Sequence, residues 1–337
     1  MRRSLGHTLQ SRYHMDDATR NTLLRTMFDL RSAVFSRCFA QPSLCSRPAI
    51  RAHSVQNSDV LDLLAVDGHV IAPEVRLDAN KGPSISLASI GRNRASTFAG
   101  LCAEHDHALF APIDGGIIDP ANSEHAFLLA YRAVLYEVHA TAASAWQVQT
   151  GYMKRVELGL DSKDQISEAA ILATHRIIVA FETFQYKVRF DAAHLTRDFG
   201  ILSHDLLRIP VSRPSIAASA LFSLDHVERD GEVVHVCLTV LPTSHNETVA
   251  LFSYMNADAD LARAELGHVL GASGPEQAYE LSRRLLNNCQ NFVLSPSYVA
   301  SWTPHKRKAI TDYFIRTLVH DDLAFHEPDL LLFATAA

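Results

Sequence analysis

The sequence contains no apolar run long enough to cross a membrane, which takes about 18 or more uncharged apolar residues. The best candidate, residues 127–138, is interrupted by Arg132 and Glu137. Arg2 and Arg3 lie near the N-terminus, but no apolar segment of the kind found in secretory signals follows them. We therefore expect a protein with no membrane partner and a cytoplasmic location.

Glycine is modest, with 14 residues in 337, and no glycine-rich phosphate-binding loop of recognised spacing is present. The G-x-S-x-G motif of serine hydrolases is missing as well. Internal repeats and low-complexity tracts are also absent. The sequence therefore lacks the common signatures of a nucleotide cofactor and of an activated serine.

Cysteine is limited to five residues, an odd number that argues against a framework of disulfide bonds. Cys237 lies in the strand-like run VVHVCLTVLP, and Cys289 lies near the end of a helical pattern. Both are expected to be small buried apolar residues. The other three, Cys38, Cys45 and Cys102, lie in the first third of the chain.

The remaining composition is typical of a globular protein, with 47% apolar and 20% charged residues. Apolar spacing predicts helices over residues 21–37, 59–68, 103–110, 123–149, 163–190, 257–270, 275–286 and 305–319. Four β-rich runs, at 206–211, 220–227, 233–242 and 248–254, predict an antiparallel sheet of three or four strands. A short strand is expected over 96–102, and residues 71–96 are expected to be irregular or weakly extended. The predicted fold class is α+β.

The most specific local pattern is the segment STFAGLCAEHDHALF, in which Cys102 is followed three residues later by His105. At the start of a helix this spacing turns thiolate and imidazole the same way, so that they can chelate one zinc ion. Tetrahedral coordination needs a second pair of ligands. Cys38 and Cys45 supply it, with a spacing wider than usual. We therefore predict a structural zinc site at Cys38, Cys45, Cys102 and His105.

The order of a cysteine pair, the step Ala52-His53 and then Cys102, His105 and Asp106 resembles the zinc-containing HNH, or ββα-metal, nucleases over about residues 36–112. The resemblance implies a treble-clef fold with His53 as the general base on the first strand of a hairpin. It also implies that Asp106, on the following helix, holds a catalytic divalent ion such as Mg²⁺. The segment is similar, too, to the FxGxCxxHDxxLF stretch of an uncharacterised group of bacterial proteins.

The reaction implied by this resemblance is metal-assisted hydrolysis of a phosphodiester, with His53 activating water near the ion held by Asp106. Such a nuclease would suit defence against foreign DNA. Two features depart from the family. The long interval between His53 and Cys102 requires an insertion, which is expected to be helical. Asn93 lies too far upstream to match the asparagine that orients the base.

The chain is predicted to have three parts: a loose tail over residues 1–20, a domain over 21–120 that contains the zinc knuckle, and an α+β domain of unknown role over 121–337. Two other functions stay open. The zinc site could staple a non-catalytic interaction module. Alternatively, His69, His105 and Asp106 could form an HD-type phosphohydrolase site, although that chemistry places its His-Asp pair inside a helical bundle. Whether the protein is an enzyme is therefore left open.

Charge is distributed unevenly around the formal net value of −6. Residues 1–101 hold 13 Lys and Arg against 8 Asp and Glu, or +5, while residues 102–337 hold 18 against 29, or −11. Four arginines accompany the predicted zinc ligands in the basic third: Arg31, Arg37, Arg47 and Arg51. We therefore expect a nucleic-acid partner, if there is one, to contact this third. The sequence gives no indication of the oligomeric state.

Overall fold

The computed structural model describes residues 16–32, 35–40, 45–78, 82–115, 117–229, 231–317 and 327–335. The chain divides into two compact units. Unit 1 consists of Met1–Val34 and Ala142–Ala180, and unit 2 of Phe35–Thr141 and Phe181–Ala337. The two longest helices, α4 (Ser123–Glu157) and α5 (Glu168–Thr196), contribute residues to both units.

The other α-helices are α1 (Asp17–Ser32), α2 (Asp62–Leu64), α3 (Ala103–Asp114), α6 (Ala259–Glu265), α7 (Gly267–Leu270), α8 (Gly274–Asn288), α9 (Pro296–Ala300) and α10 (Pro304–Thr317). A π-helical turn, η1 (Asn57–Leu61), leads into α2. The expected loose tail lies outside the described residues as far as residue 15, and α1 begins at Asp17. The α+β class is confirmed.

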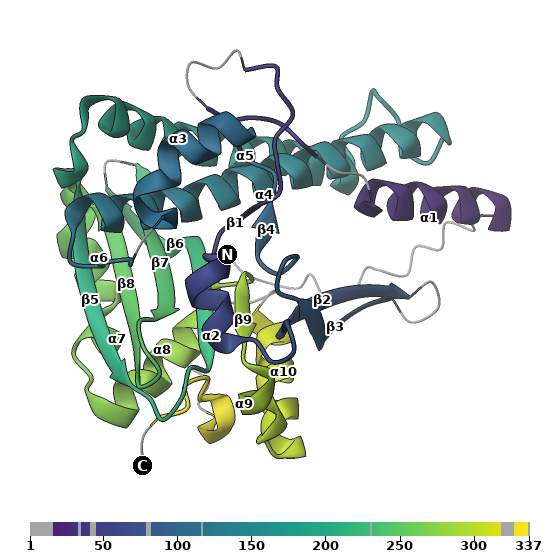
Figure 1. Cartoon of the computed structure of the whole chain (residues 1–337). Helices are drawn as coiled ribbons and strands as arrows, with labels where there is room; N and C mark the ends of the chain where they lie inside the picture. The colour runs from purple at the N-terminus through teal and green to yellow at the C-terminus, as the bar shows by residue number, and fades with distance from the viewer. Residues whose placement is uncertain are drawn as a thin grey trace. The chain divides into compact units, whose positions relative to one another are not determined.

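Unit 2 is built around a seven-stranded antiparallel sheet with the strand order β3-β2-β9-β6-β7-β8-β5 (Figure 1). Its strands are β2 (His69–Asp78), β3 (Gly82–Gly91), β5 (Leu202–Pro210), β6 (Ile216–Arg229), β7 (Glu232–Pro242), β8 (Glu247–Met255) and β9 (Phe292–Leu294). The predicted number of strands, three or four, was too small. The four predicted runs form β5 to β8, and three further strands join them.

The β2–β3 hairpin corrects the expectation that residues 71–96 are irregular. β3 alternates serine with apolar residues, and Ile85 and Leu87 pack against a hydrophobic core. This period of two is the pattern of a strand with one buried face. Pro73 and the many serines give the segment the composition of a loop, which hides the pattern. The predicted boundary near residue 120 falls between this hairpin and the other five strands of the same sheet.

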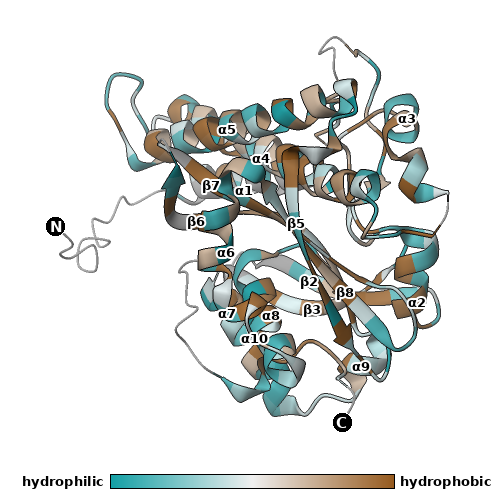
Figure 2. Cartoon of the chain, turned by 90° about the vertical axis from the view of Figure 1, so that its left-hand side faces the viewer, coloured by the Kyte–Doolittle hydropathy of each residue, from teal (hydrophilic) through white to brown (hydrophobic). Residues whose placement is uncertain are grey.

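Both faces of the large sheet are buried, which explains the uninterrupted apolar runs of its central strands. Ala217 and Leu251 belong to a core shared with α3, α4 and α5. Their neighbours Ile216 and Ala250 belong to a second core, shared with α6 to α10. The brown, hydrophobic stretches of β5 and β8 run between these helices (Figure 2). Unit 2 therefore has a helix–sheet–helix arrangement.

A charged pair lies inside the first core. Lys187 on α5 is fully buried, and its Nζ donates to both carboxylate oxygens of Asp191 at 2.7 Å. The hydroxyl of Tyr131 on α4 donates to the same carboxylate. Burial lowers the pKa of Lys187, and the hydrogen bond with Asp191 opposes that shift. The hydrogen bond from Tyr131 to this ion pair of α5 thus joins the two long helices within unit 2.

We expect Asp191→Ala to lower the free energy of unfolding by about 3–5 kcal/mol, because it leaves the Lys187 ammonium buried without a counterion. Urea unfolding followed by circular dichroism measures the change. Asp312→Ala removes the exposed ion pair with Lys308 and serves as the control, with an expected loss below about 1 kcal/mol. Equal losses in the two variants would contradict the role given to the buried pair.

Candidate metal centre

The four predicted zinc ligands converge at the start of α3. Cys102 immediately precedes this helix, and His105 lies in its first turn. Cys38 and Cys45 come from the segment that precedes β1 (Ala52–His53). The ligand atoms of all four residues lie within 4.8 Å of one another, and the group could hold a metal ion.

The spacing of these atoms fits a tetrahedral ion. Cys102 Sγ lies 3.2 Å from His105 Nδ1 and 3.9 Å from Cys45 Sγ, and Cys38 Sγ lies 3.4 Å from the same Nδ1. Tetrahedral zinc, with bonds of about 2.3 Å to sulfur and 2.0–2.1 Å to nitrogen, separates its ligands by about 3.6–3.8 Å. The three thiols of the group are free, and the 3.9 Å between Cys45 Sγ and Cys102 Sγ is far longer than a disulfide bond.

Backbone hydrogen bonds hold the cysteine-bearing segment against the start of α3. The amide of Phe39 donates to the carbonyl of Gly100 at 2.8 Å, and the amide of Ile50 donates to that of Leu101 at 2.8 Å. The amide of Cys102 donates to Cys38 Sγ at 3.3 Å. Hydrogen bonds from backbone amides to sulfur fix the orientation of a metal-binding thiolate.

Gly100 is required by this close approach. A Cβ at position 100 would lie 2.6 Å from the ring of Phe98, which is buried and packs edge-on against Tyr136. Any side chain at position 100 would therefore displace either the ring of Phe98 or the carbonyl of residue 100, which accepts the hydrogen bond from the amide of Phe39.

The thiols of the group differ in their electrostatics. Burial raises the pKa of Cys38. Burial also acts to raise the pKa of Cys102, but hydrogen bonds from the His105 amide and from the neighbouring thiols outweigh it and lower the pKa. Low-pKa thiols bind metals more readily, because the ligand is the thiolate.

His53, the predicted base, is the second residue of β1 and pairs with Thr97 of β4 (Thr97–Phe98). Its Nδ1 lies 3.0 Å from the carbonyl oxygen of Ala95. Because a carbonyl only accepts, Nδ1 carries the proton, and Nε2 of the neutral ring keeps its lone pair. Burial lowers the pKa of His53, which favours this neutral form.

Asp106, the predicted ligand of a catalytic ion, is partly buried, and its carboxylate makes no hydrogen bond to a described residue. Burial raises the pKa of Asp106, and the positive charge of Arg132 opposes this shift. Arg132 is itself buried and donates to both carboxylate oxygens of Asp114, at 2.8 and 2.9 Å. The charges of Arg132 and Asp114 also act on His53. His53 and Asp106 therefore share one electrostatic environment.

Arg132 and Asp114 were not among the predicted site residues. The only signal was that Arg132 interrupts the apolar segment FLLAYRAVLY of α4. In the structure the guanidinium lies 4.1 Å from the ring centroid of Phe110 on α3. An arginine so placed joins α4 to the helix that carries Asp106.

The insertion between β1 and β4 differs from the helical one that was expected. It contains η1 and the three-residue α2, followed by the β2–β3 hairpin of the large sheet. Asn93, at the end of this insertion, accepts a hydrogen bond from Asn57 at 3.0 Å. The chain thus leaves the small, two-stranded sheet of β1 and β4 after β1, contributes β2 and β3 to the large sheet, and returns to the small sheet at β4.

The predicted basic surface is partly neutralised. Arg37, Arg47 and Arg51 are exposed, but Arg47 forms an ion pair with Glu104 in the first turn of α3. The side chain of Arg31 lies outside the described residues. Two of the four predicted arginines are therefore exposed without an ion pair to a described residue.

Within the described ranges, one other group has three side chains close enough to hold an ion: His305, Glu327 and Asp329. His305 Nδ1 lies 2.7 Å from Asp329 in an exposed ion pair. His69, the residue invoked for an HD-type site, is not in either group. It is exposed at the start of β2, where its Nδ1 lies 2.8 Å from the carbonyl oxygen of Asp67.

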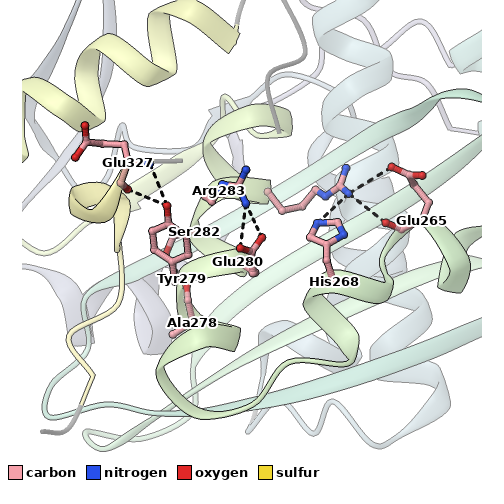
Figure 3. Close-up of polar contacts among 9 residues, drawn as sticks. Glu265, His268, Ala278, Tyr279, Glu280, Ser282, Arg283 and Glu327 are labelled. Carbon is pink, nitrogen blue, oxygen red and sulfur yellow. Dashed lines mark hydrogen bonds and ion pairs between the residues drawn. The ribbon is translucent and has the colours of Figure 1, made fainter. Parts of the chain in front are cut away.

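A surface pocket of about 630 Å³ lies among α6, α7 and α8. Three of its lining residues are glutamates, and the buried Arg283 beside them is paired with Glu280 (Figure 3). Arg284 contacts Glu265 and His268 in the same region. The negative charge of this pocket disfavours phosphate ligands.

No helix in the part of the chain that the structure describes is both long and apolar enough to cross a bilayer. No protein-family model matches the chain, and no significant match was found among curated proteins or among solved structures. The interpretation of the centre therefore rests on its own geometry and chemistry.

We expect the purified chain to contain one zinc ion, and Cys102→Ser to lose it, because Cys102 contacts two other members of the group. Elemental analysis by mass spectrometry gives the metal content. Cys237→Ala alters a buried cysteine of the large sheet outside the group and should keep the ion. A Cys102→Ser chain with a full complement of zinc would show that the metal binds elsewhere.

Proposed function

We propose that the chain is a metal-dependent nuclease that hydrolyses phosphodiester bonds at a site formed by β1, β4 and α3. The observation that carries the proposal is the orientation of His53. The Ala95 carbonyl binds Nδ1, which leaves Nε2 as a base, on a strand paired with the one that leads into the metal-ligand helix. The strand–strand–helix order is the one implied by the resemblance to HNH nucleases.

The donor set supports zinc as the structural ion. Three thiolates and one imidazole are soft and borderline ligands, and they suit four-coordinate zinc rather than Mg²⁺ or Ca²⁺. With four protein ligands the ion has no open position for substrate. Its role would be to fix the start of α3 against the segment that carries Cys38 and Cys45.

His53 would act on water. Nε2 removes a proton from the attacking water as its oxygen forms a bond to phosphorus, and the ester oxygen then leaves with the electrons of the broken bond. The proton stays on Nδ1, which donates it in a hydrogen bond to the Ala95 carbonyl, so the ring is held in one tautomer and one orientation.

Asp106 supports the expectation of a hard divalent ion. Mg²⁺ commonly binds through one or two carboxylates, completed by water and substrate phosphate. Asp106 offers one carboxylate without a hydrogen-bond partner among the described residues. Such an ion, when bound, supplies positive charge for the phosphate and the leaving oxygen. Arg132 adds a fixed positive charge, which its pairing with Asp114 partly offsets.

A non-catalytic zinc-binding interaction module is the second candidate, and one observation favours it. Within the described ranges, Asp106 does not belong to a group of three side chains able to hold an ion. Ala52, which precedes His53, offers no ligand either. Under this alternative the zinc would hold an interaction surface, and the exposed Arg37 and Arg51 would contact a polyanion without cutting it.

We expect His53→Gln and Asp106→Asn each to slow the cleavage of plasmid DNA or RNA by about 100-fold or more, the usual contribution of a general base. Both variants should keep their zinc, because neither residue belongs to the zinc group. Gel assays with Mg²⁺ or Mn²⁺ measure cleavage, and His69→Gln is the matched control. A wild-type chain that cleaves neither nucleic acid with any divalent ion would favour the interaction module. Loss of zinc in His53→Gln would show that the roles are wrongly divided.

The pH profile gives an independent test. Burial lowers the pKa of His53 from its ordinary 6.5, so the neutral, basic form persists to a lower pH than for a free imidazole. The pH at which cleavage falls to half of its plateau should therefore lie below 6.5. Single-turnover rates at a series of pH values measure the profile. A rate that is already falling between pH 8 and pH 7 would contradict a buried histidine base.

A further inference from the structure

The first half of α5 is apolar on a side where a solvated helix is normally polar. In unit 1, Ile171, Leu172, Ile177 and Ile178 are 58%, 47%, 44% and 49% exposed. Ala173, between them, is buried. From the start of α5 to the end of unit 1 the only charged residues other than histidine are Glu168 and Arg176. A helix that is apolar nearly all round is normally covered on more than one side.

These four residues form what we call the α5 row. Ile171 and Ile178 are seven residues apart, two turns along one side of the helix, and Leu172 and Ile177 lie about 100° and about 120° around the helix on either side of that line. A sevenfold apolar spacing is the pattern by which two helices pack along a common seam. Within the described residues this row is left open to solvent.

We propose that the α5 row is the interface through which two copies of this chain associate, with their α5 helices antiparallel across a twofold axis. A twofold contact places the same patch on both partners, so an apolar, nearly neutral row is its own complement. Nucleic acid would need several cations, and a membrane-surface helix would carry a band of Lys and Arg beside its apolar face. Arg176 is the single Lys or Arg residue beside the row.

The area of the row agrees with this assignment. At about 200 Å² for a fully exposed large side chain, the four exposed fractions amount to about 400 Å² of apolar surface per copy. A standard interface buries about 800 Å² on each partner, of which somewhat more than half is apolar. Glu168 and His175 lie between Ile171 and Leu172 on the helix surface, and Arg176 lies beyond Leu172 at the edge.

The test is sedimentation velocity of the full chain at micromolar concentration. We expect a dimer for the wild type, and for Ile178→Glu a dissociation constant raised at least tenfold, since the variant places two carboxylates in the seam. Leu195→Glu is the matched control, since Leu195 is 73% exposed on the same helix but outside the row, and it should leave the dimer unchanged. Far-UV circular dichroism and zinc content confirm that each variant is folded.

Either of two results would overturn the proposal. One is a wild-type chain that stays monomeric throughout this concentration range. The other is an Ile178→Glu chain that dimerises as tightly as the control. If the wild type is monomeric and cosediments with phosphatidylcholine vesicles through Ile178, the row belongs to a lipid surface. Cleavage activity does not enter this test, so its outcome is separate from that of the nuclease proposal.

Discussion

The hydrogen bonds from the amides of Phe39 and Ile50 to the carbonyls of Gly100 and Leu101 are the contacts on which the candidate centre depends. They hold the segment that carries Cys38 and Cys45 against the residues that precede α3, although the two segments are distant in sequence. The amide of Cys102 then donates a hydrogen bond to Cys38 Sγ, and the same Sγ lies 3.4 Å from His105 Nδ1. Without these bonds the four ligands would belong to unconnected loops, and a metal ion would have to pay the whole entropy of gathering them.

The small sheet is attached to the large one, so the centre is held by a rigid body. The side chain of Asn291, just before β9, donates to Ser54 Oγ at 2.7 Å and to the carbonyl of Ser219 on β6 at 2.9 Å. Gln56 donates to the carbonyl of Ile113 near the end of α3 at 3.2 Å. Ser54 and Gln56, which follow His53, are therefore both anchored, and this limits the movement of the backbone that carries His53.

The helices and central strands were predictable, because each has a pattern that one element alone explains. The apolar runs of β6 to β8 are continuous since both faces are buried, and the Cys102–His105 step marks the start of α3. The β2–β3 hairpin was missed because three of the ten residues of β3 are serine and two others are glycine. Arg132 and Asp114 could not be paired in advance, because their contact depends on how α3 crosses α4, which neither sequence segment specifies alone.

The ligands of the centre are far apart along the chain, with 67 positions from Cys38 to His105 and 57 from Cys45 to Cys102. Contacts of such separation require the closure of a long loop, which costs conformational entropy. During synthesis the first two thiols leave the ribosome before the β2–β3 hairpin and its partners exist. The centre therefore cannot be completed before His105 has been synthesised, and until then Cys38 and Cys45 lack the other two ligands.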